Sequence, residues 1–223
     1  MRSSLTYTFK LTKHLTDFGA SVNISFMLEF DSAFPHDYAV EEFGELPGTG
    51  ILKEPLIYFP KPKGRAEHNG KWLKVKAKSG KTWAGVFAYG PGSRTVVIST
   101  PEPNTVCVVS RGAGYVVNAE APEEWEEIGV CPVTDFRPMP EHKLLVFSDF
   151  TRLAAYGTDG LVWQSPRVCW DELKITRVTN ESIEGTGYDP TNSLKPEMQF
   201  AVDLKTGGSL FPSPVSAAGK PVW

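Results

Sequence analysis

The chain has 223 residues, of which 41% are hydrophobic and 22% are charged, and its formal net charge is −3. This composition is typical of a globular protein and excludes a disordered or fibrous chain. Three cysteines without a C-x-x-C pair exclude a disulfide framework and the usual zinc and redox motifs. The chain contains no run of about 18 apolar residues, so the sequence predicts no membrane span. We expect a cytoplasmic protein without cofactor, metal or membrane contact.

Glycine and proline interrupt the chain every few positions, with 20 glycines and 18 prolines in all. This leaves little room for long helices and favours many short strands joined by turns. We therefore expect a mainly β fold in a single compact domain over residues 1–223. A division into an N-terminal β region, 1–90, and a β-repeat region, 91–223, is the alternative.

The first 90 residues contain five segments with strand patterns. Apolar and polar residues alternate over Leu5–Leu11 and Val22–Phe30, which predicts two half-buried strands. Prolines interrupt residues 31–70 and leave one short strand at Leu56–Phe59. The pattern returns at residues 72–78, where a turn at Ser79-Gly80 predicts a hairpin with Thr82–Tyr89.

A lysine strip lies on the first strand of this hairpin. The segment from Lys53 to Lys81 carries nine basic residues against two acidic ones, so its net charge is +7. Alternation places Lys74, Lys76 and Lys78 on one face of the strand, with Trp72 and Trp83 available for stacking at its ends. Such a strip could bind an acidic protein or a phosphate backbone.

Two other considerations weaken a binding role for the lysine strip. Lysines on an edge strand discourage sheet-to-sheet aggregation, and the acidic stretch Glu120–Glu127 could lie against them within the same molecule. The protein is also acidic overall, with a pI near 5.9, unlike most nucleic-acid-binding domains. We favour a solvated edge, place a protein partner second and place nucleic acid last.

Residues Pro122–Ile128 are the best helix candidate. The segment has proline at its start, acids in its first turn, and Trp125 and Ile128 on one face. We expect one or two helical turns here, and at most one or two short helices in the whole chain.

The C-terminal half contains a repeated pattern. Leu153–Pro166 and Phe200–Pro214 both read as an apolar strand, a turn that ends in glycine and a second strand, and Val106–Pro122 is a fainter copy. Marker glycines at positions 114, 160 and 208 give a period of about 46 residues, the size of a blade of four short strands. We expect Trp163 and Phe211 to fill corresponding core positions.

Two turn sequences resemble those of quinoprotein-type and WD-repeat β-propellers, namely Asp203–Gly207 and Tyr156–Trp163. A propeller closes with at least four blades, whereas only two clear copies and a faint third follow residue 95. We therefore expect antiparallel sheets that form either a β-sandwich or an incomplete propeller-like array. The segment Leu145–Ile175 also resembles a pattern in small bacterial β-rich proteins, which implies a bacterial origin and transfers no catalytic residues.

No reactive constellation stands out from the sequence. There is no Gly-x-Ser-x-Gly elbow, no cysteine has a histidine nearby, and the four histidines are widely separated. Asp149, Asp159 and Asp189 could supply a carboxylate pair for hydrolysis, but aspartates beside turn residues usually bond their own backbone.

We therefore predict a non-enzymatic module that binds a macromolecule, with another protein as the first choice of partner. A carboxylate-dependent hydrolase is one alternative. A carbohydrate-binding protein is the other, with Trp72, Trp83 and Trp223 as its stacking platforms. The oligomeric state is left open.

Overall fold

The structure is a computed structural model that describes residues 29–43, 52–62 and 69–211. The described chain is almost entirely β, as the composition predicted, and its one helix is a 3-10 turn at Pro140–His142. The expected strand at Leu5–Leu11 and most of the one at Val22–Phe30 lie outside the described residues.

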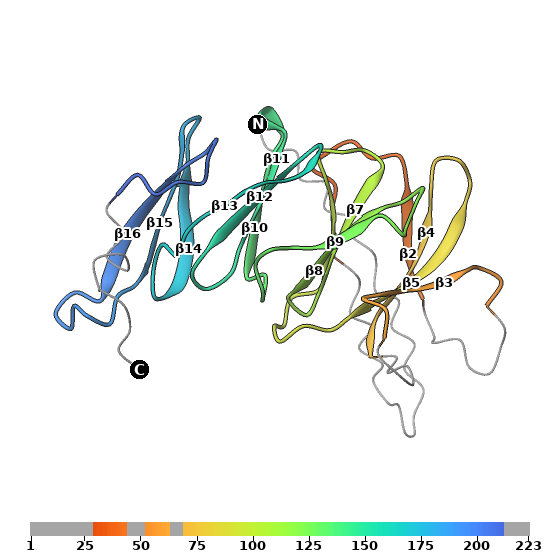
Figure 1. Ribbon diagram of the computed structural model, residues 1–223, viewed down its shortest axis with the longest axis horizontal. Coiled ribbons are helices and arrows are strands. Elements are labelled where there is room, and N and C mark those ends of the chain that lie inside the picture. Colours follow the sequence, from red (N-terminus) through yellow and green to blue (C-terminus); the bar gives the residue numbers. More distant parts are fainter. Residues whose placement is uncertain (1–28, 44–51, 63–68, 212–223) are drawn as a thin grey trace, which may run out of the picture.

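The strands form four sheets, which we number I to IV by their place in the molecule (Figure 1). In spatial order, sheet I contains β2 (Ala39–Glu42), β4 (Gly70–Lys76), β5 (Thr82–Ala88) and β3 (Leu56–Phe59). Sheet II contains β1 (Glu29–Asp31), β6 (Val96–Ser99), β7 (Thr105–Ser110), β8 (Ala113–Asn118) and β9 (Trp125–Glu127). Sheet III contains β10 (Asp135–Met139), β11 (Leu144–Ser148), β12 (Leu153–Gly157) and β13 (Gly160–Gln164). Sheet IV contains β14 (Asp171–Val178), β15 (Ser182–Tyr188) and β16 (Glu197–Asp203).

Most neighbouring strands are antiparallel, and the hairpin predicted around Ser79-Gly80 is the β4–β5 pair. Two pairs are parallel, β1 with β6 and β3 with β5. Because β1 belongs to sheet II, residues from both sides of the expected boundary at residue 90 share one sheet. The boundary itself stays a prediction.

The four sheets follow one another in the order I, II, III, IV, with a separate apolar core between each adjacent pair (Figure 1). Strand β7 shows how one sheet contributes to two cores, because its side chains alternate between the core on one face and the core on the other. Val106 and Val108 pack toward sheet I, whereas Cys107 and Val109 pack toward sheet III. A strand that is buried on both faces reads as a continuous apolar run, which is the sequence of β6 and β7.

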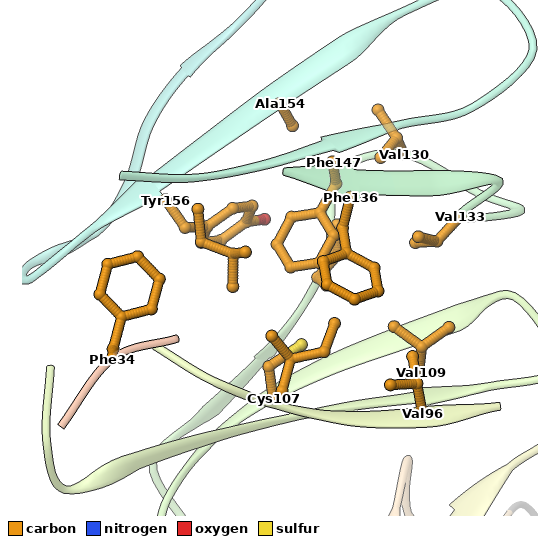
Figure 2. Packing of buried hydrophobic residues seen from close by; sticks show 13 residues of the cluster. Phe34, Val96, Cys107, Val109, Val130, Val133, Phe136, Phe147, Ala154 and Tyr156 are labelled. Atoms are coloured by element: carbon orange, nitrogen blue, oxygen red, sulfur yellow. The ribbon is translucent and has the colours of Figure 1, made fainter. Parts of the chain in front are cut away.

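The middle core joins sheets II and III (Figure 2). Phe136 and Phe147 from sheet III point toward Cys107 and Val109 on sheet II, and Tyr156 lies beside Phe147 with its ring edge-on. Sheets I and IV lie at opposite ends of the array (Figure 1), and the apolar clusters of the described residues do not join them. The architecture is therefore an open array of blade-like sheets.

A tryptophan fastens each of the two outer junctions. Trp83 on sheet I donates its indole N–H to the Ala119 carbonyl of sheet II at 2.9 Å. Trp163 on sheet III donates in the same way to the Leu204 carbonyl of sheet IV at 2.8 Å. Both carbonyls come directly after the third antiparallel strand of the receiving sheet, β8 or β16, so we call each contact a tryptophan latch.

The turns that receive the latches have the same hydrogen bonding. The side-chain oxygen of Asn118 accepts from the backbone N–H groups of Glu120 and Ala121. Asp203 likewise accepts from the N–H groups two and three residues further along the chain. Such Asx turns satisfy backbone donors where a strand ends, and here they fix the carbonyl that the indole reaches.

The structure corrects the alignment of the faint repeat. Gly160 and Gly208 follow the third strands of sheets III and IV, but Gly114 lies inside β8, the third strand of sheet II. The segment that corresponds to Phe200–Thr206 is therefore Tyr115–Ala121, which ends in the matching Asx turn. The strand–turn unit was recognised, but its position in sheet II was wrong because a strand glycine was taken for a turn glycine.

Two further expectations were wrong. Trp163 is 6% exposed and Phe211 is 53% exposed, so they do not fill matching core positions. Trp163 packs against the next sheet, whereas the described chain has no sheet beyond sheet IV to cover Phe211. Residues Pro122–Ile128 form a turn and strand β9 rather than a helix, because Trp125 pairs with Val117 of β8 and packs on Phe59 and Tyr115.

Candidate functional site: an acidic cleft between sheets II and III

A cleft of about 470 Å³ opens between sheets II and III. One wall comes from β7, β8, β9 and the loop before β7, and the other comes from β11, β12 and the turn that joins β12 to β13. The volume lies in the range of roughly 300–1,000 Å³ that is usual for ligand sites. The cleft is therefore large enough to accept several side chains of a partner.

The rim of the cleft is acidic. Its lining contains the carboxylates of Glu102, Glu124, Glu126 and Asp159 and no lysine, arginine or histidine. Within the described residues none of these four carboxylates forms an ion pair. Glu124 accepts a hydrogen bond from the Asn118 amide at 2.8 Å, which holds that carboxylate in place without neutralising it. The site is thus a concave surface of uncompensated negative charge.

The floor of the cleft is apolar and continues the middle core. Val116 of sheet II faces Leu145 and Phe147 of sheet III there, and the ring of Tyr156 lies beside them. Burial raises the pKa of Tyr156 to about 12, so its hydroxyl is neutral at physiological pH. That hydroxyl accepts a hydrogen bond from the backbone N–H of Gly129 at 3.1 Å and thereby ties the segment after β9 to sheet III.

Glu126 occupies the position at this junction that a tryptophan occupies at the next one. The Glu126 carboxylate lies 3.1 Å from where a Cβ on Gly160 would be, and the Trp163 ring lies 2.5 Å from the same point on Gly207. Both glycines have positive φ and belong to the turn after the third strand of their sheet. Sheet II thus presents a carboxylate where sheet III presents an indole, and the smaller, charged side chain leaves the junction open.

The lysine strip is arranged differently from the expected edge. Strand β4 lies between β2 and β5, so Lys74 and Lys76 are on an inner strand rather than at an edge, and Lys78 lies in the turn that follows β4. Lys74 pairs with Glu54 at 2.7 Å, and Lys78 pairs with Asp37 at 2.8 Å. The hydrogen bond from Lys74 lowers the pKa of Glu54, and the same contact raises the pKa of Lys74. The exposed Lys76 has no ion pair within the described residues.

Part of the acidic stretch does lie against this region, as expected. The Glu120 carboxylate accepts from the Ser79 N–H at 2.9 Å and from the Ser79 hydroxyl at 2.6 Å, which lowers its pKa. Lys81 donates to the Glu120 carbonyl. Glu124, in the bend before β9, and Glu126, within β9, line the cleft on the other side of sheet II instead.

The two tryptophans of the strip are not exposed platforms. Trp83 is fully buried and forms a latch, so its expected role in stacking was wrong. Trp72 is half-buried and packs edge-on against Phe43 at 6.2 Å between ring centroids. Trp223, the third sugar-stacking candidate, lies outside the described residues. The carbohydrate hypothesis therefore lacks a described pair of exposed tryptophans.

The three candidate catalytic aspartates are not brought together. Asp149 lies in the β11–β12 turn and Asp159 in the β12–β13 turn, at opposite ends of a five-residue strand, roughly 16 Å of extended chain. Asp189 follows β15 of sheet IV and accepts from the N–H and hydroxyl of Thr191. Asp149 accepts two backbone N–H groups of its own turn. Only Asp159 lines the cleft, so the hydrolase hypothesis lacks the carboxylate pair, about 5–10 Å apart, that it requires.

Other candidate chemistry is sparse in the described residues. Their His, Cys, Asp and Glu side chains form no group of three that could hold a metal ion. Cys107, Cys131 and Cys169 are free, and burial raises the pKa of each thiol. No described helix is long and apolar enough to span a membrane.

Only part of the cleft could be predicted from the sequence. The acidic stretch around Glu124 was visible, but its alignment with the other copies was shifted, so Glu126 was not matched with Trp163. Glu102 comes from the loop between β6 and β7, far from Asp159 in the chain. Pairing of sheet II with sheet III was needed to bring these residues to one rim.

Comparisons with known proteins add little to this description. No family model and no curated protein matches the chain. Among solved structures, the N-terminal domain of Nup159 matches with a TM-score of 0.34 and 13% identity over 86% of this chain and 56% of that one. A complex of S. cerevisiae Dbp5 with Nup159, Gle1, IP6 and ADP contains a chain that matches with a TM-score of 0.32 and 14% identity, over 78% of this chain and 49% of that one. The chain thus spans about half the length of these neighbours.

Proposed function

We propose that this chain is a non-enzymatic protein-binding module and that the cleft between sheets II and III is its contact site. The observation that carries the proposal is the cleft itself: a concave surface with an apolar floor and four rim carboxylates without ion-pair partners. Binding sites commonly combine such an apolar floor with a few polar groups.

The proposal also explains why one junction breaks the rule of the others. A tryptophan at position 126 would extend the latch pattern, whereas glutamate leaves the half-buried Val116 in an open cleft. Departures from local consistency are expected at functional sites, where stability gives way to binding.

The test uses a random peptide library displayed on phage, selected on the purified chain. We expect enriched sequences that bind the native chain and lose binding to Glu126→Trp, in which the indole fills the cleft. Lys76→Gln is the control, since this exposed lysine lies on sheet I, away from the cleft, and the variant should bind as the native chain does. Absence of enrichment, or equal binding to Glu126→Trp, would contradict the proposal.

A further inference from the structure

We infer that the cleft binds an extended segment of a partner protein in which lysine or arginine residues alternate with other residues. This inference rests on the proposed function and specifies the chemistry of the partner. It is carried by the charge of the rim, by the spacing of its carboxylates and by the apolar floor.

Charge is the first argument. Four carboxylates without counterions repel one another, and a cationic side chain between them removes that repulsion. Glu54 and Asp37, beside sheet I, differ in that each already has a lysine partner. A cation from outside the chain therefore gains at the cleft, where four unpaired carboxylates line one concave surface.

The spacing of the carboxylates is the second argument. Glu124 lies in the bend directly before β9 and Glu126 lies within β9, and both line the cleft. Residues on one side of an extended strand follow one another at roughly 6.6 Å. Two basic residues at positions i and i+2 of an extended partner can therefore each meet one of these neighbouring carboxylates.

The floor supplies the third argument. Lysine and arginine side chains bury their aliphatic stems on apolar surface while their charged heads reach a polar rim. Val116 lines the cleft and is half-buried, so it offers such a surface beside the carboxylates. A rim of this kind above an apolar floor suits a basic side chain better than a compact inorganic cation, which would leave the floor uncovered.

The probes are fluorescein-labelled peptides of one length in which lysine, glutamine or glutamate alternates with alanine, measured by fluorescence polarisation on the full chain. We expect the lysine peptide to bind, the glutamine peptide to bind at least tenfold more weakly and the glutamate peptide not to bind. Binding of the lysine peptide should weaken when NaCl is raised from about 50 to about 300 mM, because salt screens the rim charges.

Variants then locate the charge effect. Glu124→Gln, Glu126→Gln and Asp159→Asn keep side-chain shape, and each should weaken the lysine peptide about two- to five-fold, the range expected for one exposed ion pair. Glu123→Gln is the matched control, since this exposed glutamate removes the same charge beside the cleft but does not line it. Thermal unfolding of each variant verifies that it is folded.

Failure of this inference differs from failure of the proposed function. If library peptides bind and Glu126→Trp abolishes their binding, but they lack basic residues and ignore the three neutralising substitutions, only the inference is overturned. If no peptide binds, the proposed function is overturned as well. Spermidine is a further probe: saturable binding tighter than that of every peptide would show a polyamine site and would overturn the inference.

Discussion

The two outer junctions and the middle junction of the array differ in how they are closed. Between sheets I and II, and again between sheets III and IV, a buried indole donates to a carbonyl in the turn of the next sheet. Between sheets II and III the corresponding place holds Glu126, and the contacts come instead from the Tyr156 hydroxyl and the Gln164 amide, both of which reach Gly129.

This difference separates the residues that hold the array together from those that are free to bind. An indole fills the space between two sheets and satisfies a buried carbonyl at once, so a latched junction has little surface left for a partner. A carboxylate in the same place cannot donate to a carbonyl and is best solvated or paired, which keeps the junction open.

Removal of either latch should have the largest effect. Trp83→Ala and Trp163→Ala each leave a cavity between two sheets and an unsatisfied carbonyl, and we expect each to lower the free energy of unfolding by about 3–5 kcal/mol. Urea denaturation followed by circular dichroism measures this loss. A loss below about 1 kcal/mol in either variant would mean that the latch is not structural.

The hydrogen bond of the latch can be tested apart from its volume. Trp163→Phe keeps an aromatic ring but leaves the buried Leu204 carbonyl without its donor, so we expect a loss of about 1–3 kcal/mol. Trp125→Phe is the matched control, because the Trp125 indole N–H has no hydrogen bond within the described residues. Equal losses in the two variants would assign the effect to ring size alone.

Conversion of the middle junction should act in the opposite direction. Glu126→Trp places an indole beside Gly160, fills the cleft and brings a donor to the turn after β12, so we expect stabilisation by about 0.5–2 kcal/mol together with loss of peptide binding. Differential scanning calorimetry measures the gain. A destabilised variant would show that the middle junction is not built to the plan of its neighbours.

Acid should weaken the contact between sheet I and the turn after β8 by a smaller amount. Hydrogen bonds from Ser79 lower the pKa of Glu120 below its ordinary value of 4.5, so this contact stabilises the protein above that pH and is lost as pH falls through the lowered pKa. Thermal unfolding at pH 7 and in acid measures the difference. Glu120→Gln should show a smaller acid-induced drop in melting temperature, and an unchanged drop would contradict this account.

Several elements could be predicted from local sequence because local physics determines them. Alternation in residues 72–78 fixed one face of β4 as apolar, and the glycine turn at Ser79-Gly80 fixed its hairpin. The two C-terminal strand–turn units were also found, since the positive φ of Gly160 and Gly207 in their turns favours glycine. The structure of the segment 122–128 was not predicted correctly, because pairing with β8 outweighed its helical pattern.

The mainly β fold and the strand–turn units of the C-terminal half followed from the sequence alone, since they depend on residues close together in the chain. Which tryptophans are latches and which charges are neutralised followed from the packing of the sheets. The same fold placed Glu102, Glu124, Glu126 and Asp159 around one cleft. The physical reason is that burial and ion pairing depend on which sheet packs on which, and an alternating pattern shows that a face is covered without showing what covers it.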